Sequence, residues 1–148
     1  MIKNIVSGGT MKLSKFEYML LLLITTEFIL CFLFINHLTI FQYMIFVQII
    51  PSILSAFFIG RIAARSRFKW LVILTSSIVF VIVIISILNV TPISTIENNT
   101  VQSKTSVILF NRNMKIGTYF GLFFQEFLLS TFVLMIITLF NRIKSGKF

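Results

Sequence analysis

The chain has 148 residues, of which 57% are hydrophobic and only 11% are charged, and its formal net charge is +9. A soluble domain carries about 25% charged residues, so this composition excludes an ordinary water-soluble fold. Four membrane spans of about 20 residues each would use more than half of the chain, which leaves no room for a separate soluble module. The basic residues flank the apolar runs instead of forming a stripe, and this placement argues against a nucleic-acid partner.

Enzyme and cofactor chemistry have little basis in this sequence. There is one Cys, Cys31, one His, His37, and no Asp. A single Cys and a single His do not make a zinc-type ligand set, and six residues apart they do not share a helical face. No phosphate-binding glycine loop and no G-x-S-x-G motif occurs. We therefore predict no catalytic residue, no metal and no cofactor.

The first span is expected at about Phe16–Ile35, after a basic and flexible leader over residues 1–15. This apolar run is too long for a signal peptide, and no Ala or Gly occurs between Thr10 and Ala56 to form a cleavage site. We expect the run to remain in the mature protein. Glu17, beside Lys15 at the start of the span, is expected to be a solvated interfacial residue.

Three further spans follow in chain order. The polar turn 36–39 is short enough to force an antiparallel neighbour, and a second span is expected at about residues 40–60, with a kink at Pro51. A third span, at about 70–89, begins with Trp70 as an interfacial anchor. The fourth is expected at about 117–140, before a basic tail over 141–148. The predicted fold is an all-α, antiparallel bundle of four transmembrane helices.

The distribution of Lys and Arg predicts the orientation. Three lie in the leader, four in residues 61–69 and three in the tail, whereas the turn 36–39 has none and the loop 90–116 has three. The positive-inside rule then puts both termini in the cytoplasm, and the composition favours the cell membrane of a low-GC bacterium. The basic loop is expected to set the topology and to attract anionic lipid headgroups; its cations are Arg61, Arg65, Arg67 and Lys69.

Polar side chains inside the spans are the strongest clue to function. A carboxylate at a helix centre costs about 2.5–3.5 kcal/mol, yet Glu27 and Glu126 each lie nine residues from the predicted outer end of their span. Both should sit about 14 Å below the outer surface. Gln48 falls in the same layer, and Gln125 adjoins Glu126. If these faces converge, the two carboxyls would share a proton, as in a proton- or cation-coupled site. Taken alone, this layer favours neutral Glu and Gln side chains that hydrogen-bond the helices together, over an ion or substrate site.

Small residues at four-residue spacing predict close helix packing. One series begins the fourth span, with Gln125 continuing its face, and consists of Gly117 and Gly121. The other lies in the second span below Pro51, with Ser55 beside it, and consists of Ser52, Ala56 and Gly60. Packing within the bundle is the favoured interpretation, and a homo-oligomer or larger membrane complex is the alternative.

The loop 90–116 is long for a plain connection, which points to a role of its own or to disorder. Its β-branched stretches Ile93–Ile96 and Thr100–Phe110 flank two Asn residues, a pattern that allows a short hairpin. Connection and recognition of an external molecule are equally supported.

Three hypotheses for function follow. The favoured one is a small transport-type protein, or a membrane subunit of a transport complex, that uses the carboxylate layer. The alternative is a non-transporting accessory, immunity or regulatory protein that acts through its outer loop. A membrane enzyme with the two glutamates as acid and base ranks last.

Overall fold

The computed structural model describes residues 13–100 and 115–146, and over these ranges it contains helices and no strand. In chain order the elements are α1 (Lys15–Phe34), η1 (Ile35–His37), α2 (Ile40–Tyr43), η2 (Met44–Ile49), α3 (Ile50–Arg65), α4 (Lys69–Val90), α5 (Ile93–Asn99) and α6 (Ile116–Lys144). They form four segments long and apolar enough to cross a membrane, Lys15–His37, Ile40–Arg65, Lys69–Val90 and Ile116–Lys144. The prediction of four long apolar helices packed together is confirmed.

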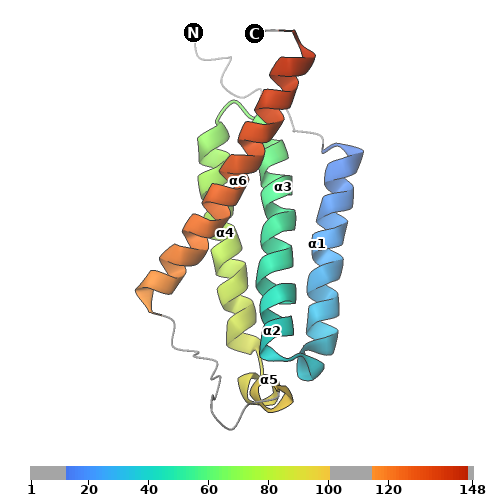
Figure 1. The fold of residues 1–148 in the computed structure, drawn as a ribbon, viewed down its shortest axis with the longest axis vertical. Helices are drawn as coiled ribbons and strands as arrows, with labels where there is room; N and C mark the ends of the chain where they lie inside the picture. The colour runs from blue at the N-terminus through green and yellow to red at the C-terminus, as the bar shows by residue number, and fades with distance from the viewer. Residues whose placement is uncertain (1–12, 101–114, 147–148) are drawn as a thin grey trace, which may run out of the picture.

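The helix α3 lies at the centre of the bundle. It contacts α1, α4 and α6, and α6 also contacts α4. Consecutive long helices run in opposite directions, and α6 crosses α3 and α4 obliquely (Figure 1). The start of α1, the end of α3, the start of α4 and the end of α6 gather at one end of the bundle, and α5 lies at the other (Figure 1).

Two capping boxes define where the first two spans begin. The Ser14 side chain accepts a hydrogen bond from the Glu17 backbone, while the Glu17 carboxylate accepts one from the Ser14 backbone. Thr39 and Gln42 make the same reciprocal pair at the start of α2. Each box satisfies two backbone N–H groups that a helix start leaves without a partner.

The predicted distortion at Pro51 takes the form of a π-helical segment. Residues Met44–Ile49 form η2, in which backbone hydrogen bonds join residues five apart, as in the bond from the Ile50 N–H to the Ile45 carbonyl. In this register the next carbonyl, that of Phe46, would pair with the nitrogen of Pro51, which carries no hydrogen. The Cys31 thiol donates to the Phe46 carbonyl instead, at 3.4 Å.

Beyond the third span the chain packs against the turn between the first two spans through α5. Ile96 is 1% exposed, the Asn99 amide donates to the carbonyls of Asn36 (2.7 Å) and Leu38 (3.2 Å), and the Ile40 N–H donates to the Thr100 hydroxyl (2.9 Å). The predicted first arm of a hairpin is therefore wrong, because these side chains fit a helix seated on the turn. The second arm falls largely in residues 101–114, which lie outside the described residues.

Candidate functional site

Glu126 on α6 is fully buried against α3. Its Oε1 accepts a hydrogen bond from the Ser55 hydroxyl at 2.7 Å and a long one from the Ser130 hydroxyl, one turn further along α6, at 3.5 Å. Its Oε2 is buried and has no hydrogen-bond partner among the described residues. A carboxyl group in the apolar interior is thus held by hydroxyls alone.

A line of polar side chains extends from this carboxyl along the second span toward its start at Ile40. The Gln125 amide donates to the Ser52 hydroxyl at 3.3 Å, and the Gln48 amide donates to the Gln125 carbonyl oxygen at 3.4 Å. Together, Glu126, Ser55, Ser130, Ser52, Gln125 and Gln48 are called the Glu126 cluster below. Spans two and four supply all six side chains.

The Ser55 hydroxyl gives the cluster a choice of hydrogen-bond direction. Its oxygen lies 2.7 Å from Glu126 Oε1 and 3.1 Å from the Ser52 carbonyl, but a hydroxyl has only one proton to donate. Facing a carboxylate, Ser55 donates to Glu126. Facing a protonated carboxyl, it can accept from Glu126 and donate to the carbonyl. The Oε1 atom of Glu126 therefore has a hydrogen-bond partner in either charge state without a change of fold.

No cation of the described residues forms an ion pair with Glu126. Two cavities flank the cluster. One of about 330 Å³ is lined by Ser55 and Pro51 together with side chains of α1 and α4, and one of about 170 Å³ is lined by Gln48, Tyr43 and Thr118. Each cavity thus reaches a polar member of the cluster, Ser55 in one and Gln48 in the other.

Small residues of α3 bring the two helices close enough for these bonds. Ser52 and Ala56 are each 1% exposed, and a Cβ on Gly60 would lie 2.7 Å from Val133 Cγ1 and 3.2 Å from the Leu134 nitrogen. We call this contact the α3–α6 seam. It uses the face of α6 that carries Glu126 and Ser130.

The second predicted packing series takes no part in the bundle. Gly117 and Gly121 are exposed, and nothing lies within 4 Å of a Cβ built on either. The expectation that they pack inside the bundle is wrong, because α6 crosses obliquely and its first turns diverge from α3 (Figure 1). Gln125, expected to continue their face, is half-buried and turned toward the seam.

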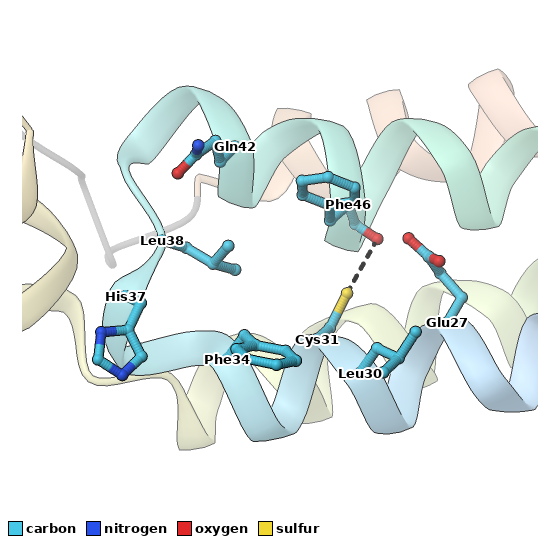
Figure 2. Close-up of a pocket in the computed structure, with 8 residues that line it drawn as sticks. All are labelled: Glu27, Leu30, Cys31, Phe34, His37, Leu38, Gln42 and Phe46. Atoms are coloured by element: carbon cyan, nitrogen blue, oxygen red, sulfur yellow. Dashed lines mark hydrogen bonds between the residues drawn. The ribbon is translucent and has the colours of Figure 1, made fainter.

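Glu27 lies apart from Glu126, on the other side of the second span. It lines a cavity of about 380 Å³ with Cys31 and Phe46, whereas Gln48 on the same η2 segment bonds to α6. Figure 2 shows the Glu27 carboxyl and the Cys31 thiol turned toward the segment that carries Phe46. The structure thus brings together three of the four predicted polar residues, Gln48, Gln125 and Glu126, and leaves Glu27 outside.

Glu17 differs most from its prediction as a solvated residue, because its side chain is fully buried. It forms an ion pair with Arg65, and Arg61 Nε lies 3.8 Å from its Oε1. The Arg61 guanidinium also lies over the Phe16 ring, 4.7 Å from its centroid. Two cations of the predicted lipid-facing loop therefore join α1 to α3, while Arg67 and Lys69 remain exposed.

The sequence interpretation missed the hydroxyls that hold Glu126. Ser55 was expected only as a packing neighbour, and Ser130 was not singled out. A spacing of four residues between Glu126 and Ser130 puts both on one helical face, and this was the available signal. Comparison with protein-family models, with curated proteins and with solved structures gave no match.

Proposed function

We propose that this protein is a small multi-pass membrane protein of transport type, acting alone or as the membrane subunit of a transport complex. Glu126 is its proton- or cation-binding group. The observation that carries this proposal is the pairing of Glu126 with Ser55, in which either charge state of the carboxyl finds a partner.

The surroundings of the carboxyl fit this role better than that of a structural ion pair. A buried charge is normally paired with an opposite one, and Glu126 has only hydroxyl neighbours. A proton, or a small cation held by carboxylate and hydroxyl oxygens, would satisfy the oxygen that lacks a partner. The flanking cavities at Ser55 and Gln48 supply approaches from two sides.

The orientation that accompanies this function has both termini in the cytoplasm. Its support is the gathering of Lys15, the 61–69 loop and the end of α6 at one end of the bundle (Figure 1). Anionic lipid headgroups would be the partners of the exposed cations Arg67, Lys69, Arg142 and Lys144.

The test is ion flux in liposomes that contain the purified protein, with a pH-sensitive dye inside and an imposed gradient. We expect Glu126→Gln, which keeps the size of the side chain and a hydrogen bond to Ser55, to abolish flux while the protein stays folded. Ser55→Ala should reduce flux, because it removes the hydroxyl that serves both charge states. Wild-type flux in the folded Glu126→Gln variant would overturn the proposal.

A protein without flux of its own could still be a transport subunit, and purification from native membranes in mild detergent distinguishes the two. A stoichiometric ATPase or permease in the preparation would assign Glu126 to that complex, and the same two variants would then be assayed in it. Absence of both flux and a transport partner would exclude the proposal in either form.

The seating of α5 on the outer turn favours a second candidate, an accessory, immunity or regulatory protein that presents this helix to an external molecule. The Asn99 and Thr100 bonds hold α5 in place, whereas Ser94 and Asn98 are exposed. Ser94→Arg together with Asn98→Arg should then abolish activity without loss of folding. Retained activity in this variant would exclude the second candidate.

A further inference from the structure

The cavity beside Glu27 is the part of the molecule that the Glu126 cluster does not use. It has a volume of about 380 Å³ and lies between α1 and the second span. Figure 2 shows Glu27 at one end of it and His37 at the other, with Leu30, Phe34 and Leu38 along the side of α1 and the following turn. We call this space the Glu27 pocket. Its volume is in the range of small-molecule sites, about 300–1,000 Å³.

Glu27 supplies the acidic side chain of this pocket. Glu27 makes no ion pair with any described residue, and its Oε1 is buried without a hydrogen-bond partner. His37 lines the same pocket but is exposed, and ten residues along the helix put it about 15 Å from Glu27. The side-chain amide oxygen of Gln42 already accepts a hydrogen bond from the Thr39 backbone N–H, so it is less available to a ligand's donor. Glu27 is half-buried, and its buried Oε1 calls for a bound positive charge or a hydrogen-bond donor.

We propose that the Glu27 pocket binds an organic cation, an ammonium or similar monovalent group carried on an apolar body. The carboxylate would pair with the positive group, and the faces of Phe34 and Phe46 would attract the cation and cover its apolar part. An anionic amphiphile, or a neutral one without a hydrogen-bond donor, would leave Glu27 Oε1 without a partner, and a neutral donor would lack the charge attraction. The pocket is separate from the Glu126 cluster, so binding here does not depend on the proposed transport function.

Cys31 supplies a reporter that needs no engineering. It is the only cysteine of the chain, it lines the pocket, and it lies one helical turn from Glu27, on the same face of α1. We would label the purified protein with a cationic trimethylammonium-ethyl thiosulfonate and, separately, with an anionic sulfonato-ethyl thiosulfonate. Intact-mass spectrometry then gives the two initial rates.

The cationic reagent should react faster with the native protein, and Glu27→Gln should lower the ratio of cationic to anionic rates by about tenfold or more. Tetraphenylphosphonium should slow labelling by the cationic reagent in the native protein and have no such effect in Glu27→Gln. Glu126→Gln is the matched control, because it makes the same change outside the pocket, and it should keep both the ratio and the protection.

Three results would overturn the inference. The first is an equal rate ratio in the native protein and in Glu27→Gln. The second is protection by tetraphenylphosphonium that persists in Glu27→Gln. This result would mean that tetraphenylphosphonium acts by partitioning into the detergent, or that an acyl chain occupies the pocket. The third is a Cys31 that reacts with neither reagent in the folded protein and with both after denaturation, which would mean that the pocket is closed. Loss of flux in Glu126→Gln with unchanged labelling would separate the two proposals.

Discussion

The central helix α3, with the η2 segment that leads into it, separates two differently built sides. On the α6 side, small residues let the helices approach until a Gly60 Cβ would clash with Val133, and the carboxyl of Glu126 is fully buried and bonded to Ser55. On the α1 side, a pocket opens between α1 and the part of the second span that precedes α3, and the Glu27 Oε1 lacks a partner. Where the helices approach closely, serine hydroxyls hydrogen-bond the Glu126 carboxyl. Where a pocket remains, the Glu27 carboxyl is left available to a ligand.

The largest expected effect tests the close approach at the α3–α6 seam. Gly60→Leu should destabilise the protein by about 1–3 kcal/mol or prevent folding, because overpacked side chains force helices apart. Thermal unfolding in detergent, followed by circular dichroism, measures the loss. Gly121→Leu is the control, since nothing lies within 4 Å of its Cβ, and it should leave the melting temperature within a few degrees of the native value. Equal effects of the two substitutions would contradict the seam.

The second prediction compares the two carboxyls directly. Glu126→Ala should cost about 2–3 kcal/mol, because it opens a cavity and removes the hydrogen bonds of Ser55 and Ser130. Glu27→Ala should change the stability by less than about 0.5 kcal/mol, since the side chain faces a pocket that already exists. The same unfolding experiment measures both variants. A larger loss of stability for Glu27→Ala would mean that Glu27, and not Glu126, is the carboxyl that is bonded inside the bundle.

The third prediction concerns what holds α1 despite the pocket. Arg65 pairs with the buried Glu17, but the Arg65 side chain is 44% exposed, so solvent screening should limit the coupling in a Glu17/Arg65 double-mutant cycle to about 1 kcal/mol. Arg65→Gln should also raise the rate of Cys31 labelling, as α1 loosens. Arg67→Gln, which removes the same charge nearby from an exposed side chain, should do neither. A labelling rate that rises equally in both variants would show that charge alone matters.

The smallest expected effect tests the bond between α1 and η2. Cys31→Ala should cost about 0.5–1 kcal/mol, because the Phe46 carbonyl loses its donor. In a Pro51→Ala background, residue 51 gains an N–H that can donate to the Phe46 carbonyl in place of the Cys31 thiol. The cost of Cys31→Ala should then shrink toward zero. Additive costs in the two backgrounds would mean that the proline does not create the need for the thiol.

Among the described residues, the sequence by itself determined the number of long helices and the places where they start. Twenty-residue apolar runs have no stable alternative in lipid, where every backbone polar group must be bonded within the segment. Capping residues such as Ser14 and Thr39 and the interruption at Pro51 act within a few neighbours. The layer of Gln48, Gln125 and Glu126 could also be inferred, since the rise of a helix fixes depth along the chain.

Only the tertiary structure decided which faces meet. The depth of a residue follows from counting, but its direction depends on how each helix turns and crosses its neighbours. That is why Glu27 faces a pocket while Glu126 meets Ser55, and why Gly60 packs while Gly121 does not. Glu17 is the clearest case, because its burial depends on Arg61 and Arg65 from the end of α3. The residues next to Glu17 in the sequence do not predict that two side chains more than forty residues away will contact it.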